Sequence, residues 1–262
     1  MPVEYYVFPE NKNYAVFAEN NLSWANLDEK SEDAQIPHPG NISSVLCSVR
    51  ALFEPCFGTE HVNRRALAVF PTNGDNMACA RYHVIFLSAR GSNWCQYAYQ
   101  FAHELCHFMI NADIVKPLRW FEESICELAS LFFLPGITEQ WEDAPPYPQW
   151  KPYAREFSAY IEEEVKPTSA VIPEGISFSE YFSRKMGHLE THEYERDINR
   201  LCAMHLLPIF EETPALWRDT LHLGKLHAGH TFLKSLQHWR ELSDAKNAIE
   251  KIIALFEGRR DV

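Results

Sequence analysis

The sequence predicts an α+β fold in two regions. Residues 1–140 are expected to hold a small mixed or antiparallel sheet and two long helices, and residues 141–262 a mostly helical C-terminal lobe. Short runs of β-branched and aromatic residues occur in the first third of the chain, where they are typical of strands. Apolar residues at helical spacing dominate the second half. The proline- and aromatic-rich residues 136–152 indicate a surface connection between the two regions.

The first elements are strands and one helix. Residues 5–8 and 14–18 are β-prone and flank a turn-forming segment, which predicts a hairpin. Residues 42–53 have apolar positions at helical spacing. Two further strands are expected over 66–70 and 82–87, with a proline- and glycine-containing turn between them.

The next predicted helix, over residues 93–110, contains His103-Glu104-Leu105-Cys106-His107. Residues four apart lie on one face of a helix, so both imidazoles can reach one metal ion. Glu104 is placed to meet a metal-bound water rather than the metal itself. This spacing is typical of zinc hydrolases, which need a third protein ligand and leave a fourth position open.

A second helix is predicted to begin at Pro117, because proline is favourable in the first helical turn. It is expected to run past Ser130 and to stop near Pro135-Gly136. Glu123 and Glu127 are four residues apart and therefore share one face of this helix.

Beyond residue 152 the pattern is helical, over residues 153–165, 178–185, 194–210 and 232–256. Pro208 is expected to end or kink the third of these helices near Leu206. His222, His227 and His230 are close in sequence, but no carboxylate or cysteine stands at ligand spacing beside them. The sequence therefore does not favour a second metal site there.

The two metal-motif helices together resemble the gluzincin metallopeptidases, in which Trp-x-x-Glu-Gly-x-Ala-Glu follows His-Glu-x-x-His. The matching residues begin at Trp120 and end at Glu127, with Ser124 in place of the usual glycine and Cys126 in place of alanine. The resemblance implies a zincin-like catalytic region over residues 1–140, with zinc held by His103, His107 and Glu123. It also implies that Glu127 accepts a hydrogen bond from a ligand histidine, and that residues 82–87 form the sheet edge beside the cleft, with an interior strand as the alternative.

Other assignments remain open within the second helix. Glu122 points about 100° away from Glu123 around the helix, so only one of the two can face the metal. The ending Leu-Phe-Phe-Leu-Pro at residues 131–135 also resembles the regulator-cleaving ImmA/IrrE-type peptidases. In that alignment Glu122 becomes the ligand candidate, and exchanging the roles of Glu123 and Glu127 is a further alternative.

The gluzincin resemblance implies zinc-dependent peptide hydrolysis, in which Glu104 acts as general base on a zinc-bound water and then as general acid. Members of this class commonly supply a Tyr or His to stabilise the oxyanion, tens of residues after the glutamate ligand. Tyr194 is the expected donor here, and His188 and His192 are its rivals. The absence of a Gly-x-Met-x-Asn motif favours an endopeptidase over an aminopeptidase, and the helical lobe is expected to complete the cleft.

Composition narrows the class of partner and the compartment. The formal net charge is −12, with no block of lysine and arginine, which argues against nucleic-acid binding. No long apolar run or signal peptide is visible, so no membrane partner is expected. Seven cysteines without a CxxC pair favour free thiols and a cytoplasmic location. A polypeptide substrate is therefore expected; the alternatives are a zinc-stabilised binding or regulatory module and a non-proteolytic metal-dependent enzyme.

Overall fold

The computed structural model describes residues 16–19, 22–25, 39–62, 67–72, 74–80, 83–110, 114–227 and 229–258. Contacts divide the chain into two compact units, and each unit is built from two separate stretches of sequence. One comprises Met1–Met109 and Phe133–Tyr160, and the other Ile110–Phe132 and Ile161–Val262. The sequence analysis divided the chain at residue 140 by function, into a catalytic region and a lobe that completes the cleft. The contact-based units do not test this functional division, which stays a prediction.

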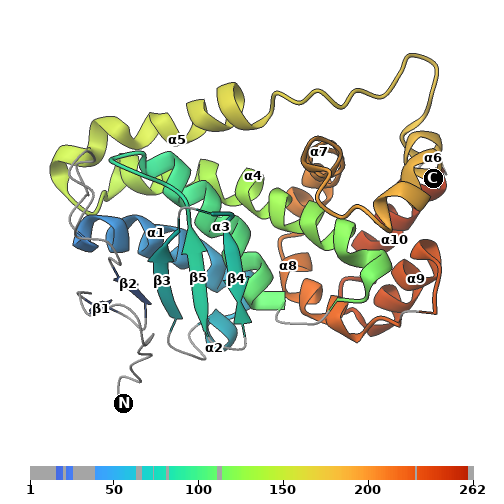
Figure 1. Cartoon of the computed structure of the whole chain (residues 1–262), viewed down its shortest axis with the longest axis horizontal. Coiled ribbons are helices and arrows are strands. Elements are labelled where there is room, and N and C mark those ends of the chain that lie inside the picture. Colours follow the sequence, from blue (N-terminus) through green and yellow to red (C-terminus); the bar gives the residue numbers. More distant parts are fainter. Residues whose placement is uncertain are drawn as a thin grey trace. The chain divides into compact units, whose positions relative to one another are not determined.

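Most of the described residues are helical, and a small mixed sheet lies near the N-terminal end of the chain (Figure 1). The predicted α+β class is therefore confirmed at this coarse level. None of the helices in the described ranges is both long enough and apolar enough to cross a bilayer.

Within the described residues the sheet has five strands in the order β1-β2-β3-β5-β4. They are β1 (Val16–Glu19), β2 (Leu22–Ala25), β3 (Leu67–Pro71), β4 (Met77–Cys79) and β5 (Val84–Leu87). The pairs at both ends of the order are antiparallel, whereas β3 pairs in parallel with β2 and with β5. The strands predicted over 66–70 and 82–87 are thus confirmed as β3 and β5.

One prediction about the sheet needs correction, and one open alternative is decided. The hairpin partner of β1 is β2, which the sequence analysis missed, and residues 5–8 lie outside the described residues. The strand over 82–87 is interior, because β5 lies between β3 and β4. The edge is β4, whose Met-Ala-Cys sequence carries no β-branched residue and so gave no strand signal.

Helix α1 (Pro39–Phe57) confirms the helix predicted over 42–53 and extends it at both ends. It contacts β1 and β2 and runs beside the sheet (Figure 1). Its core-facing side chains are fully buried: Ile42, Val45, Leu46, Val49 and Phe53. The short α2 (Thr59–Val62) follows after Gly58, whose φ of +90° ends α1 in a conformation that favours glycine.

Helix α3 (Trp94–Ile110) follows β5 as predicted. Helix α4 (Arg119–Asp143), entered through the short η2 (Lys116–Leu118), does not stop at Pro135-Gly136 but continues to Asp143. A proline inside a helix costs about 3 kcal/mol. Leu134, Ile137 and Trp141 are each fully buried, and burying such side chains contributes about 1.5–3 kcal/mol each, so packing outweighs the proline.

Gly136 adds a steric reason for this course of α4. A Cβ atom at this position would lie 3.2 Å from Cδ1 of Leu52 on α1. The missing side chain therefore permits a close approach of the two helices. The predicted surface connection over 136–152 is accordingly shorter, since α4 occupies its first half and η3 (Pro148–Tyr153) its last residues.

The C-terminal helices follow the predicted pattern with two differences. Elements in order are α5 (Ala154–Tyr160), η4 (Ile161–Val165), α6 (Phe178–Leu189), α7 (Arg196–Glu212), α8 (Leu216–Asp219), η5 (Thr220–Lys225), α9 (Phe232–Leu242) and α10 (Lys246–Glu257). Pro208 does not end α7, because Leu206 and Phe210 on either side of it are fully buried.

The single helix predicted over 232–256 is two helices. The break falls at Ser243 and Ala245, where a side-chain carboxylate replaces helical hydrogen bonds. The Ser243 hydroxyl and the backbone N–H of Ala245 both donate to Oδ2 of the buried Asp219, the latter at 2.9 Å. A residue 24 positions upstream thus contributes to the break, together with the Ser243 hydroxyl oxygen, which accepts a local hydrogen bond from the backbone N–H of Ala245 at 2.8 Å.

Candidate metal centre

Helix α3 positions the two motif histidines. Its buried side is formed by Ala98, Phe101, Ala102, Leu105 and Cys106, and it leaves His103 and His107 half-buried. The two ring centroids are 5.0 Å apart, as expected for residues one turn apart.

The connection from β5 to α3 is held by one buried side chain. The Oε1 atom of Gln100 accepts from the backbone N–H of Ala89 at 2.9 Å, and its Nε2 atom donates to the Ser88 hydroxyl at 3.0 Å. Gln100 stands one turn before His103, so the strand end and the histidine-bearing turn are fixed to each other.

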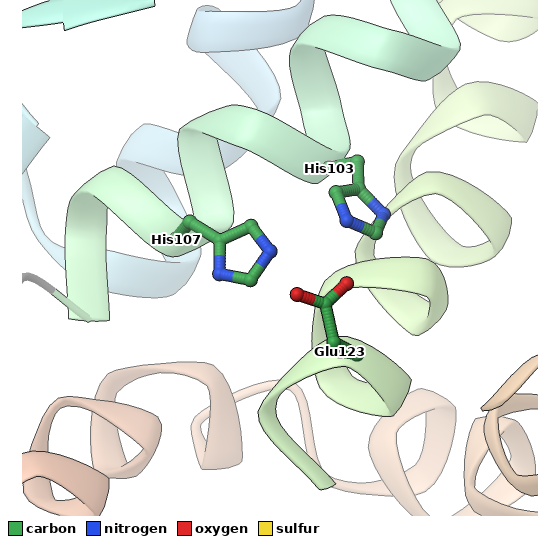
Figure 2. Close-up of side chains that lie close together, drawn as sticks. All are labelled: His103, His107 and Glu123. Carbon is green, nitrogen blue, oxygen red and sulfur yellow. The ribbon is translucent and has the colours of Figure 1, made fainter. Parts of the chain in front are cut away.

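Glu123, on the first half of α4, completes a group with the two histidines. One ligand atom from each of His103, His107 and Glu123 lies within 4.8 Å of the others. Figure 2 shows the Glu123 carboxylate directed toward both imidazole rings. Among the residues that the structure describes, this is the one group of His, Cys, Asp and Glu side chains whose ligand atoms converge so closely.

The donor set fits a divalent transition-metal ion. Two atoms bound to one zinc ion at about 2.1 Å are at most about 4.2 Å apart, so ligand atoms that lie within 4.8 Å of one another need only a small movement to coordinate it. Rotations about the side-chain bonds of half-buried residues can supply such a movement. The predicted association of two imidazoles and the Glu123 carboxylate is therefore present, and the identity of the ion as zinc stays a prediction.

The structure distinguishes the three glutamates of α4. Glu123 belongs to the converging group, and neither Glu122 nor Glu127 does. Glu122 is half-buried, whereas Glu127 is 3 % exposed. The alternative in which Glu122 or Glu127 takes the place of Glu123 is not the arrangement seen here.

Glu127 has a charged partner that the sequence analysis missed. The guanidinium of Arg200, on α7, donates from Nε to Oε1 of Glu127 at 2.7 Å and from Nη1 to the Pro167 carbonyl at 3.2 Å. Both side chains are nearly buried. The partners are 73 residues apart, so no spacing in the sequence could reveal the pair. The predicted hydrogen bond from a ligand histidine to Glu127 stays a prediction.

The two departures from the gluzincin pattern, Ser124 and Cys126, are both fully buried on α4. The Ser124 hydroxyl donates to the Trp120 carbonyl one turn earlier at 2.9 Å. Burial raises the pKa of the Cys202 thiol to about 12, although a hydrogen bond with Ser124 lowers it in part. Small side chains thus occupy these two buried positions on α4.

Glu104, the expected general base, follows His103 on α3 and is 5 % exposed. A side chain one residue further along a helix points about 100° away. Glu104 therefore does not compete with the histidines for the metal, and it is not a member of the converging group.

Tyr194, the expected oxyanion donor, is exposed, in contrast to the buried Glu104. Tyr194 precedes α7 by two residues and is 77 % exposed. Its rivals form their own exposed cluster: the rings of His188 and His192 stack at 4.3 Å, and His188 Nε2 lies 2.7 Å from Oε1 of Glu195. An oxyanion donor acts best in a water-excluded site, and the role of Tyr194 as that donor stays a prediction.

A separate open cavity of about 540 Å³ lies among residues 169–198. Tyr181, Arg184, Lys185, Glu195 and Asp197 are among its lining residues. None of the three converging residues lines it, so it is not the metal centre.

Comparison of the chain with protein-family models, with curated proteins and with solved structures returned no match.

Proposed function

We propose that this protein is a zinc-dependent metallopeptidase of the gluzincin type, and specifically an endopeptidase that cleaves a polypeptide substrate. The observation that carries the proposal is the convergence of His103, His107 and Glu123 on one small volume, with Glu104 in the intervening helical turn. The two histidines and one glutamate are the ligand set of this class of zinc site.

A bound zinc ion would supply Lewis-acid polarisation of the substrate carbonyl and a water of lowered pKa. The chain's own residues supply the remaining steps. Glu104 removes a proton from the attacking water as the new carbon–oxygen bond forms. The same carboxyl group then donates that proton to the leaving amine when the peptide carbon–nitrogen bond breaks.

Substrate binding is assigned to the edge strand of the sheet. Among the described strands, β4 ends the strand order and pairs antiparallel with β5. Its outer side can accept an extended peptide as a further strand, with main-chain hydrogen bonds as the principal source of affinity. Binding along an extended segment suits an endopeptidase, because it requires no free substrate terminus.

A cytoplasmic location is part of the same proposal. None of the seven cysteines, all of which are among the described residues, forms a disulfide bond, and four of them are buried. Free thiols persist in a reducing compartment. Targeting of a reporter-tagged full chain to the cytoplasm would support this location.

The function is tested with purified protein, a peptide library and the Glu104→Gln variant. We expect the variant to keep its zinc and to lose about 10²–10⁴-fold in hydrolysis, the usual contribution of a positioned general base. Glu122→Gln is the matched control, since this carboxylate lies outside the converging group. Equal turnover by Glu104→Gln and wild type would exclude the mechanism. Complete lack of cleavage together with loss of thermal stability on zinc removal would instead favour a zinc-stabilised binding module.

The donor set favours one second candidate. Two histidines and one carboxylate are also the ligands of non-haem iron(II) oxygenases, and the convergence seen here is equally compatible with that set. Metal-free protein reconstituted with zinc or with iron(II) separates the two candidates. Peptide cleavage with zinc supports the peptidase, whereas oxygen consumption with iron(II) and no cleavage with zinc supports a hydroxylase.

A further inference from the structure

Three histidines around the start of α9 form a cluster that lies outside the proposed active site. The ring centroids of His227 and His230 are 5.5 Å apart, those of His227 and His238 5.4 Å, and those of His230 and His238 5.9 Å. His227 and His230 lie in the segment before α9, and His238 lies on α9 itself. The cluster thus joins residues up to 11 positions apart by tertiary folding.

The segment is anchored on both sides of the histidines. Leu226 and Phe232 are buried, at 5 % and 4 % exposure. The backbone N–H of His230 donates to the His227 carbonyl at 3.2 Å, which turns the chain back toward α9. Two histidines are thereby placed beside a third on a regular helix.

The hydrogen bonds of two of the rings leave nitrogens available for a ligand. His238 Nδ1 lies 3.2 Å from Oε2 of Glu241, one turn further along α9. A carboxylate at one nitrogen fixes the proton there and leaves the lone pair of Nε2 for a metal. The Nδ1 atom of His230 is buried and has no hydrogen-bond partner in the structure. An unsatisfied buried polar atom is costly, and a bound cation would satisfy it.

We propose that His227, His230 and His238 form a second metal site for a divalent transition-metal ion such as Zn²⁺, with Glu241 orienting His238. Imidazole nitrogen is a preferred donor for such ions. Three imidazoles bound to one ion at about 2.1 Å in tetrahedral geometry have ring centres about 5 Å apart, close to the observed separations. The ring nitrogens of these three histidines are not as close together as the ligand atoms of His103, His107 and Glu123. Binding of an ion therefore requires the rings to rotate about their side-chain bonds.

His222 is not part of the proposed second metal site. His222, which the sequence groups with His227 and His230, instead accepts at Nδ1 from the Lys225 ammonium at 2.8 Å. The third histidine of the cluster is His238 and the neighbouring carboxylate is that of Glu241. Both lie on α9, and ring contacts bring His238 beside His227 and His230. His222 therefore serves as a control residue close in sequence but outside the site.

The test is a Zn²⁺ titration of the full-length, tag-free and metal-depleted protein by calorimetry, with circular dichroism as a folding check. We expect about two equivalents for wild type, about one for His238→Ala, about one for His107→Ala and none for the double variant. His222→Ala should still bind about two equivalents. Glu241→Gln, the milder variant, should weaken the second site about 10- to 100-fold without removing a ligand.

Each outcome separates this site from the proposed active site. If His238→Ala binds as much zinc as wild type, or if His222→Ala loses as much as His238→Ala does, the second site is excluded. If wild type binds one equivalent that is lost in His238→Ala but not in His107→Ala, the second site stands and the proposed peptidase centre fails. If His238→Ala unfolds, the affinity of Glu241→Gln for Zn²⁺ at the second site is the deciding measurement. An affinity equal to that of wild type overturns the proposal.

Discussion

The Nε atom of Arg200 donates a hydrogen bond of 2.7 Å to Oε1 of Glu127, one helical turn beyond Glu123 on α4. The pair is nearly buried, so its charges are weakly screened. Arg200 also donates to the Pro167 carbonyl, which ties α7 and the segment before α6 to the glutamate-bearing helix. A residue of the C-terminal helices thus holds the helix that carries the proposed third ligand.

Arg200→Leu should destabilise the fold by about 3–5 kcal/mol, because it leaves the buried Glu127 charge without its partner. Urea unfolding followed by circular dichroism measures this change. The double variant Arg200→Leu/Glu127→Leu should recover much of the loss, since an apolar pair of similar size carries no buried charge. Equal stability of Arg200→Leu and wild type would show that the ion pair contributes nothing. Arg155→Leu is the matched control, because the Arg155–Glu142 pair is exposed and should change stability by less than about 1 kcal/mol.

His107→Ala and Glu123→Ala should each lose about one equivalent of bound zinc, since a catalytic zinc site depends on three protein ligands. Metal analysis of protein purified without added metal or chelator measures the loss. Glu122→Ala should keep its zinc, because Glu122 is not part of the converging group. Retention of zinc in Glu123→Ala together with its loss in Glu122→Ala would favour the ImmA/IrrE-type assignment.

Tyr194→Phe should lower kcat by about 10²–10³-fold with little change in KM, the usual effect of removing one oxyanion donor. Steady-state kinetics on a cleaved peptide measures both constants. His188→Gln and His192→Gln are the comparison variants, because these histidines are the rival donors. A normal kcat in Tyr194→Phe combined with a low kcat in either histidine variant would transfer the role to that histidine.

Cys202 should resist alkylation in the folded protein at pH 8. Its thiol is fully buried, and burial raises its pKa to about 12, so both access and the thiolate form needed for reaction are lacking. Mass spectrometry after timed alkylation should find Cys202 unmodified and the half-buried Cys79 modified. Labelling of both cysteines at equal rates in folded protein would contradict this packing.

Features that depend on local periodicity can be predicted from the amino-acid sequence. The four-residue spacing of His103 and His107 places both on one face of any helix. Runs of β-branched and aromatic residues predict β3 and β5, and apolar residues at helical spacing predict α1 and α3. These features arise from neighbouring residues, so their geometry follows from backbone dimensions alone. The α+β class follows from the same local patterns.

Features that join distant segments depend on how those segments pack together, and local patterns in the sequence did not predict them. The convergence of Glu123 rather than Glu122 or Glu127, the position of β4 at the sheet edge, and the contact of Arg200 with Glu127 all depend on packing between elements far apart in sequence. The continuation of α4 through Pro135 and the break at Ser243 have the same origin, because buried side chains and one carboxylate outweigh local propensity. Free energies of burial and of hydrogen bonds between distant residues exceed those of local preference, and a single sequence shows only the latter directly.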